Sequence, residues 1–311
     1  MFAIESDSLS KVYRSGVFRR QEVTALSEFS IQVETGQIFS LLGPNGAGKT
    51  TFIKMLLSLA SPTSGTATVL GSRLPDVRVR EKVGYLPENH RYPGYLTGEQ
   101  VLKYFGELGG VPPGSLPGRI GDLLRLVGLS QWSKTKVKRY SKGMMQRLGL
   151  AQALINEPEI IFLDEPTDGV DPVGRKEIRE ILKDLKMRGK TVFLNSHLLS
   201  EVELISDRVA ILDKGRLLKV GTVEELTSTG EAYVIGITGT LPEPVTLAAR
   251  AFVIGLSQKG ESVTADCRTT AELNRLIDLL RKNNVEITSI TRQHSSLEDS
   301  FISLITKEAR Q

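Results

Sequence analysis

The nine residues GPNGAGKTT, from Gly43 to Thr51, constrain the fold more than any other stretch of this chain. They match the pattern G-x-x-x-x-G-K-[ST], which binds nucleotide phosphates when it joins a strand to a helix. The apolar run QIFSLL precedes the pattern, and apolar residues on one face of a helix, Ile53, Leu56 and Leu57, follow it. We therefore expect an α/β domain in which this loop holds the phosphates of a nucleotide.

Each residue type in the loop has its own task at a phosphate. Backbone N–H groups from Asn45 to Thr51 wrap around the oxygens, and the following helix adds its positive dipole end. Gly46 and Gly48 let the backbone approach closely, because a Cβ atom would collide with the phosphate. Lys49 reaches the β- and γ-phosphates, and the Thr50 hydroxyl is a ligand for Mg²⁺. The predicted phosphate-binding residues are Gly43, Asn45, Gly46, Ala47, Gly48, Lys49, Thr50 and Thr51.

The first 225 residues alternate apolar runs with helical patterns. Continuous apolar runs at residues 37–43, 159–165, 191–196 and 208–213 are typical of strands buried on both faces of a parallel sheet. A helix is expected from Asp171-Pro172, a capping residue followed by proline at the first helical position. Between Pro87 and Arg139, Gly/Pro-rich pieces flank helical segments such as Leu123–Val127. We therefore predict a sheet domain at residues 1–225 with a helical insertion at about residues 88–140.

The last 86 residues, 226–311, predict a small α+β domain. Strands are expected at residues 231–238 and 284–291, with a helix over Ala271–Lys282. Thr269 and Glu272 have the spacing of a capping box for that helix. A last helix is expected to begin near Ser295, and its apolar stripe is Leu297, Phe301, Leu304 and Ile305.

Composition excludes several classes of protein. No apolar run approaches the roughly 18 residues of a membrane span, and the single cysteine, Cys267, can form no internal disulfide. With three scattered histidines, these features fit a reducing cytosol. The formal net charge of +4 is mild for 311 residues, so no nucleic-acid partner is expected.

Two adjacent carboxylates end the apolar run IIFLDE. Asp164 and Glu165 fall at the carboxyl end of a predicted strand, where ligands of such sheets bind. Taken alone, this pair is equally typical of a structural cap. Since it follows a phosphate loop, we predict that Asp164 holds Mg²⁺ through water and that Glu165 polarises the attacking water. No N-K-x-D guanine reader is found, which argues against a GTPase.

Four segments in order, GPNGAGKTT, YSKGMMQR, IIFLDEPTDGVDP and NSH, resemble the ATP-binding subunit of ABC transporters over about residues 3–225. The resemblance implies an ABC ATPase domain and a head-to-tail dimer, in which ATP lies between one copy's phosphate loop and the other copy's YSKGM stretch. Ser141 is a natural N-cap and Gly143 keeps the approach open, so both are expected to meet a γ-phosphate. Lys142 and Met144 replace the family's glycine and glutamine. Lys142 either adds charge at the dimer interface or points to solvent.

The same resemblance implies further site residues. Tyr13 matches the aromatic residue that stacks on adenine, and Asp171 matches a residue that reaches across the dimer. His197 matches the switch histidine that touches the γ-phosphate. Glu88 occupies a position where glutamine is usual, and its carboxylate can still face Mg²⁺ or the attacking water. Glu165 and His197 are thus the expected catalytic residues, with ATP and Mg²⁺ as cofactors.

The function implied is ATP hydrolysis that powers a separate membrane-spanning permease docked near residues 88–140. The start of the last helix, SLEDSF, resembles the C-terminal extension of drug, antibiotic or polysaccharide exporter ATPases, which favours export and an accessory or dimerisation role for residues 226–311. Such a subunit would be cytoplasmic, bound through the permease to the inner face of the membrane. The alternatives are an ABC ATPase with a non-transport partner and an interaction module with a vestigial loop. The single phosphate loop and the 92 residues between Lys49 and Ser141 argue against translation and DNA-repair types.

Overall fold

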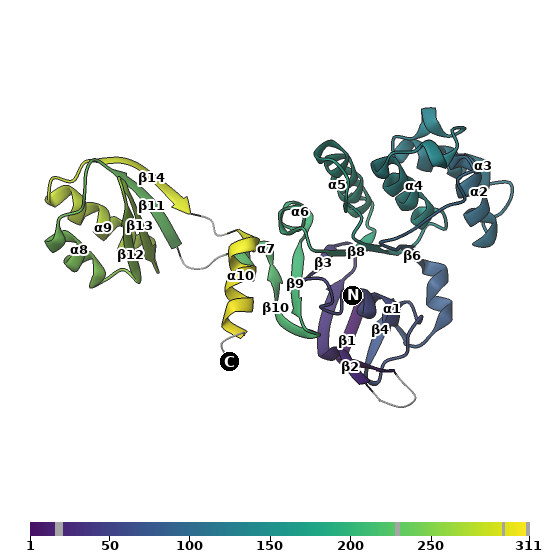
Figure 1. The fold of residues 1–311 in the computed structure, drawn as a ribbon, viewed down its shortest axis with the longest axis horizontal. Coiled ribbons are helices and arrows are strands. Elements are labelled where there is room, and N and C mark those ends of the chain that lie inside the picture. Colours follow the sequence, from purple (N-terminus) through teal and green to yellow (C-terminus); the bar gives the residue numbers. More distant parts are fainter. Residues whose placement is uncertain (16–20, 228–230, 294–295, 309–311) are drawn as a thin grey trace. The chain divides into compact units, whose positions relative to one another are not determined.

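The computed structural model describes residues 1–15, 21–227, 231–293 and 296–308, so the expected helix start at Ser295 lies outside the described residues. The chain divides into two compact units, Met1–Val223 and Glu224–Gln311, which are described separately here (Figure 1). Within the described residues, no helix is both long enough and apolar enough to cross a bilayer.

A six-stranded sheet forms the centre of the first unit. Its order is β10-β9-β3-β8-β7-β6, in which the five strands from β9 to β6 run parallel and β10 pairs antiparallel with β9. The strands are β3 (Ile38–Leu42), β6 (Val83–Leu86), β7 (Ile160–Asp164), β8 (Thr191–Ser196), β9 (Arg208–Asp213) and β10 (Arg216–Thr222). The strands expected from the four apolar runs are confirmed, and β3, β7 and β8 are buried along their whole length.

A second, antiparallel sheet of order β2-β1-β4-β5 lies in the same unit, and the sequence did not predict it. Its strands are β1 (Phe2–Ser15), β2 (Gln21–Glu34), β4 (Ser64–Val69) and β5 (Ser72–Arg73). Phe29 of β2 and Phe39 of β3 belong to one buried core with Phe52. This core therefore joins the antiparallel sheet to one face of the parallel sheet.

Helices cover the other face of the parallel sheet. These helices are α2 (Gly98–Leu108), α3 (Leu116–Leu126), α4 (Lys142–Leu154), α5 (Pro172–Met187) and α6 (Leu199–Ile205). Helix α1 (Lys49–Leu56) instead belongs to the core shared with the antiparallel sheet, and α7 (Val223–Thr227) lies in the second unit except for its first residue. Short 3₁₀ turns occupy Val77–Lys82, Ser130–Trp132 and Val137–Arg139. The α/β class is confirmed, and α2 and α3 lie in the segment expected to be a helical insertion. A second core holds α2–α5 against the alternate strand residues Ile38, Ile161 and Val192.

The second unit is a β-α-β-β-α-β arrangement followed by a helix (Figure 1). Its elements are β11 (Glu231–Ile237), α8 (Glu243–Arg250), β12 (Gly255–Lys259), β13 (Ser262–Cys267), α9 (Thr270–Lys282), β14 (Ile287–Gln293) and α10 (Leu297–Glu308). The antiparallel sheet order β12-β13-β11-β14 gives the ferredoxin-like topology. The Thr269 hydroxyl caps α9 by accepting from the Glu272 N–H, as its spacing predicts, whereas the Glu272 carboxylate accepts from Arg268 rather than Thr269.

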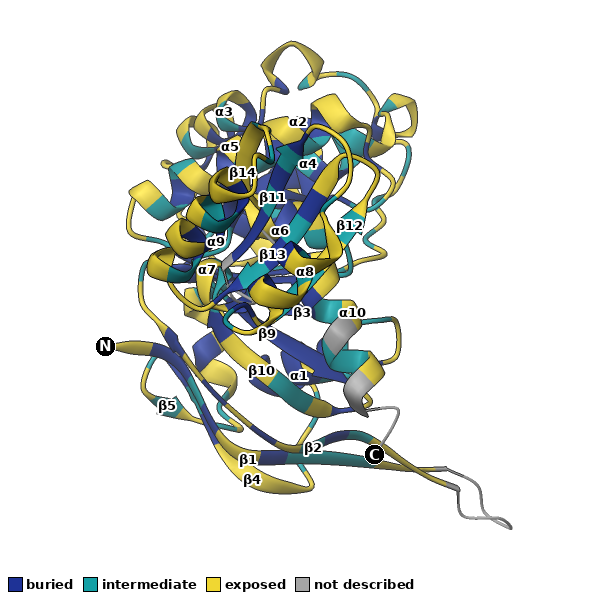
Figure 2. Cartoon of the chain, turned by 90° about the vertical axis from the view of Figure 1, so that its left-hand side faces the viewer, coloured by how far each residue is buried: buried dark blue, intermediate teal, exposed yellow. Residues whose placement is uncertain are grey.

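Burial follows the pattern of each element. Figure 2 shows strands of the parallel sheet in dark blue, and the helices of both units carry yellow outer sides. In the second unit Tyr233, Ile235 and Ile237 of β11 all point to one core, which is the period of two expected for a strand with one covered face.

Candidate nucleotide-binding site

The loop from Gly43 to Gly48 joins β3 to α1, as its sequence predicts. Glycine is required at both ends, because a Cβ atom on Gly43 would lie 2.2 Å from the Leu212 carbonyl oxygen and one on Gly48 would lie 2.3 Å from that of Ala25. Gly48 also has a φ of +110°, which favours glycine. Phe52 anchors α1 through its ring, 5.8 Å from that of Phe193 in β8. The loop is therefore held between a buried strand and an anchored helix.

A cleft of about 300 Å³ opens at this loop. Most of the residues predicted to bind nucleotide line it, and they are joined by three residues of β2. The lining residues are Val23, Thr24, Ala25, Asn45, Gly46, Ala47, Gly48, Lys49, Thr50, Thr51, Glu88, Asp164 and Glu165. The β2 residues were not predicted, since nothing in the sequence indicates that a distant antiparallel strand meets the loop.

Lys49 is buried, and its ammonium group is held by the loop itself. The Nζ atom donates to the carbonyl oxygens of Gly43 at 2.6 Å and Pro44 at 3.3 Å. It also lies 3.6 Å from Oε1 of Glu165, which has no other partner among the described residues. The lysine thus stands between the loop and the carboxylate, within reach of the cleft that all three line.

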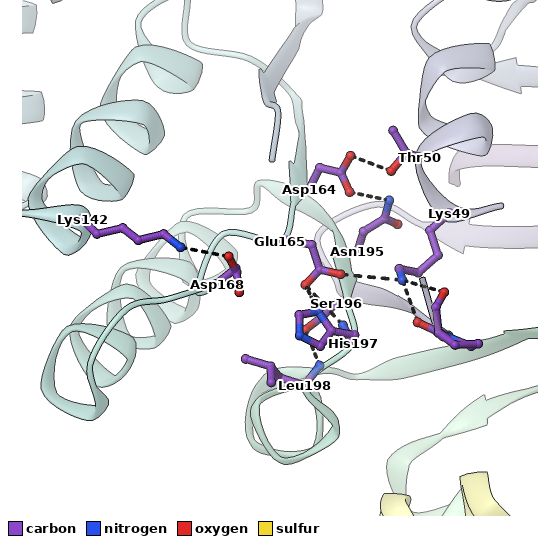
Figure 3. A network of polar contacts seen from close by, with 12 residues as sticks. Lys49, Thr50, Lys142, Asp164, Glu165, Asp168, Asn195, Ser196, His197 and Leu198 are labelled. Atoms are coloured by element: carbon purple, nitrogen blue, oxygen red, sulfur yellow. Dashed lines mark hydrogen bonds and ion pairs between the residues drawn. The ribbon is translucent and has the colours of Figure 1, made fainter. Parts of the chain in front are cut away.

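Asp164 is held through both carboxylate oxygens at the end of β7. Thr50 Oγ1 donates to Oδ2 at 2.9 Å, and Asn195 Nδ2 donates to Oδ1 at 3.1 Å (Figure 3). Asn195 comes from β8, the neighbouring strand, where it pairs directly with Asp164. The sequence reasoning did not assign Asn195 a role, although a polar residue ending a buried apolar strand is a usable signal.

Glu165 and His197 form a second pair beside the first. The His197 ring nitrogen Nδ1 lies 2.8 Å from Oε2 of Glu165, and the His197 backbone N–H donates to the same oxygen at 3.3 Å (Figure 3). Glu165 adopts a φ of +54°, an unusual backbone conformation for a residue with a side chain. Burial raises the pKa of Glu165 above its ordinary value, while His197 and Lys49 oppose that rise. A carboxylate with such a pKa is suited to accept a proton.

Six predicted residues are not among those that line the cleft: Tyr13, Gly43, Ser141, Gly143, Asp171 and His197. Tyr13 is 41% exposed on β1, with Lys11 Nζ 5.0 Å from the centre of its ring. Ser141 and Asp171 cap α4 and α5, and their side chains accept from the backbone N–H groups of Met144 and Gly174. Both caps are exposed at helix N-termini.

Lys142 forms a contact within its own chain. Its Nζ donates to Asp168 at 3.0 Å, so the side chain spans from the start of α4 to the loop before α5 (Figure 3). The ammonium group lowers the pKa of Asp168. Gly169 makes room for this crossing, because a Cβ atom there would lie 2.0 Å from Nζ.

The oxygen-rich side of the cleft suits a hard divalent cation. Thr50, Asp164 and Glu88 all line it, and oxygen donors are the ligands that Mg²⁺ prefers. Among the described residues no group of three or more His, Cys, Asp and Glu side chains is arranged to hold a metal ion. That fits Mg²⁺, which is usually bound by one or two carboxylates together with substrate phosphates.

Known sequences similar to this chain are ATP-binding proteins of ABC transporters. Residues 26–168 match the family model described as ABC transporter. An uncharacterized ABC transporter ATP-binding protein from Synechocystis is 42% identical over 96% of this chain and 83% of its own length. The bacitracin transport ATP-binding protein BcrA of Bacillus licheniformis is 33% identical over 97% of each chain.

Solved structures resemble the first unit. The structure of an ATP-binding subunit of an ABC transporter, 29% identical, aligns with a TM-score of 0.63 over 72% of this chain and 91% of that one. The dimeric, post-hydrolysis structure of the cassette MJ0796 with ADP and Pi is 24% identical and aligns with a TM-score of 0.63 over 70% of this chain and 98% of its own. At that identity, the second comparison supports the fold alone.

Proposed function

The chain belongs to the ATP-binding proteins of ABC transporters and hydrolyses ATP, and from this premise we propose that it powers a separate membrane-spanning permease of an export system. The observation that carries the proposal is the placing of Lys49, Asp164 and Glu165 in one loop cleft, with His197 in contact with Glu165. Export is favoured by the full-length similarity to BcrA, whose name describes bacitracin transport.

In the proposed reaction, water attacks the γ-phosphate of ATP to give ADP and phosphate. Lys49 exchanges the carbonyl oxygens of Gly43 and Pro44 for β- and γ-phosphate oxygens. Glu165 accepts a proton from the attacking water, and His197 keeps that carboxylate oriented through the 2.8 Å contact. His197 is also proposed to touch the γ-phosphate.

Mg²⁺ would be held by Thr50 and Asp164, with Glu88 as a further carboxylate lining the same cleft. When bound, it would supply charge neutralisation at the phosphates. Tyr13 is proposed to stack on adenine, because its aromatic ring on β1 is 41% exposed. It pairs in register with Val23, which lines the cleft.

A head-to-tail pair of copies is proposed for the active form. Ser141, Gly143 and Asp171 lie at exposed helix starts away from their own chain's cleft, and helix N-termini bind anions. Their proposed role is to complete the cleft of a second copy. Residues 226–311 are proposed to be an accessory or dimerisation domain that follows the ATPase domain of residues 1–225 in the chain.

The permease is proposed to dock on the helical insertion, which places the chain in the cytoplasm at the inner face of the membrane. A hollow of about 430 Å³ there is lined by Arg91, Tyr92, Pro93, Tyr95, Leu96, Val101, Tyr104 and Phe105. Tyr95 and Tyr104 are 71% and 56% exposed. Exposed aromatic side chains around a hollow are typical of protein interfaces.

Replacing Glu165 tests the proposed chemistry. Glu165→Gln should keep ATP binding and lower the turnover rate by roughly 10²–10⁴-fold, the range for loss of a general base. Lys49→Ala is the matched control, and it should lose ATP affinity in a titration with a fluorescent analogue. Undiminished hydrolysis by Glu165→Gln would refute the role of Glu165.

The identity of the partner tests the transport assignment. The chain should be isolated from its native cells with its partner, which mass spectrometry then identifies. A polytopic membrane protein, lost when Tyr95 and Tyr104 are changed to Glu, is the expected result. A partner from ribosomes or nucleic-acid metabolism would favour the alternative of a non-transport ATPase.

A further inference from the structure

We propose that Asn195 is a positioning residue for Asp164, holding the carboxylate in the orientation that a divalent cation requires. The inference rests on the proposed function, in which Asp164 binds the cation. Asn195 and Asp164 are both buried, 0% and 2% exposed, and they are joined by the 3.1 Å hydrogen bond from Nδ2 to Oδ1. A buried carboxylate oxygen without a hydrogen-bond donor is unfavourable, so the contact stabilises this orientation of Asp164.

The backbone fixes this contact in place. Asn195 and Asp164 are direct partners in the parallel pairing of β8 with β7. Two residues further along the chain, the His197 ring forms a hydrogen bond with the Glu165 carboxylate. The end of β8 therefore holds both carboxylates of the site, one through an amide and the other through an imidazole (Figure 3).

The amide can face Asp164 in only one way. If it were turned over, Oδ1 would meet a carboxylate oxygen, and two acceptors repel. Figure 3 shows the nitrogen toward Asp164, and Oδ1 has no hydrogen-bond partner among the described residues. A buried amide with an unpartnered oxygen is unfavourable. The arrangement is therefore explained by the donation to Asp164 rather than by packing.

Asn195 also differs from the other donor to Asp164. Thr50 belongs to the loop and helix that receive the phosphates, and its hydroxyl is itself a proposed ligand of the cation. Asn195 instead belongs to the buried strand β8, outside the loop and helix that receive the phosphates. An amide is neutral, and it therefore orients Asp164 without competing with the cation for the carboxylate, as a lysine ammonium would.

The test measures metal binding directly. Mn²⁺ replaces Mg²⁺, and electron paramagnetic resonance follows its binding to the full chain with a non-hydrolysable ATP analogue. Asn195→Leu removes the donor at nearly constant size and should weaken Mn²⁺ affinity by about 10-fold or more, as loss of an outer-shell partner does. Nucleotide affinity in the presence of EDTA should stay unchanged.

Ser40→Ala is the matched control, since Ser40 lies on β3 of the same sheet outside the cleft and the change removes its part-buried hydrogen bond to Ser206. It should leave Mn²⁺ affinity unchanged. If Asn195→Leu does not fold, Asn195→Ala replaces it with the same expected loss. Equal Mn²⁺ affinity in wild type and the Asn195 variant would overturn the role of Asn195 and leave the proposed function unaffected. Wild-type chain that binds no Mn²⁺ with nucleotide would overturn the metal assignment to Asp164 as well.

Discussion

Alanine substitutions at two glycines of the phosphate loop separate backbone strain from steric collision. At residue 48, alanine would have to keep a φ of +110° and place its Cβ atom 2.3 Å from the Ala25 carbonyl oxygen. The left-handed conformation costs about 1–2 kcal/mol, and overpacking adds about 1–3 kcal/mol. At residue 46, φ is +83° but nothing lies within 4 Å of an added Cβ. We therefore expect Gly48→Ala to lower the free energy of unfolding by about 2–5 kcal/mol and Gly46→Ala by about 1–2 kcal/mol.

The single tryptophan allows the unfolding of the first unit to be followed separately from that of the second unit. Trp132 belongs to the first unit, so its fluorescence during urea unfolding reports on the unit that carries the loop. Equal destabilisation by the two substitutions would refute the collision between residue 48 and β2. ATP affinity should nevertheless fall for Gly46→Ala, because on the proposed function its new methyl group meets the phosphates.

Four further outcomes are expected. Because burial raises the pKa of Glu165, its contribution to stability is present at low pH and is lost as pH rises through that pKa. Glu165→Gln should thus gain stability relative to wild type as pH rises from the ordinary carboxylate range through the raised pKa of Glu165, and a pH-independent difference in urea unfolding would contradict this. Lys142→Met removes the exposed ion pair to Asp168 and should cost less than about 1 kcal/mol in the same unfolding assay. Ser141→Arg should abolish hydrolysis and dimer formation, followed by light scattering, with monomer ATP binding nearly unchanged; equal loss of binding and turnover would argue against a shared site. Burial, and then the charges of Asp164 and Glu88, raise the pKa of Tyr85 to about 12, so Tyr85→Phe should remove one group titrating there in ultraviolet absorbance.

The parallel sheet and the loop cleft could be predicted because their sequence signals are local. A strand buried on both faces is read from a continuous apolar run, such as IIFL in Ile160–Asp164. The phosphate loop is likewise recognised from consecutive residues, because its own backbone forms the binding site. Asp164 and Glu165 then reach the loop because β7 and β3 are parallel and both flank β8. This is the edge where ligands bind in such sheets.

The antiparallel sheet and its contribution to the cleft could not be predicted. β1 and β2 pair with several register shifts, for example between Ser6 and Leu9, which break the alternation that identifies a strand. The cleft residues Val23–Ala25 have no chemistry that sets them apart from other strand residues. The strand predicted from residue 284 instead begins at Ile287, because Asn284 takes a φ of +56° after α9.

The backbone of Glu165 has a consequence for any attempt to make this protein more heat-resistant. Its φ of +54° is tolerated by glycine and asparagine far better than by glutamate. Random mutagenesis screened for melting temperature alone would therefore tend to enrich replacements at this residue. The selected variants would be more thermally stable but would lack ATPase activity. A screen that couples heat challenge to phosphate release would be needed to retain the glutamate.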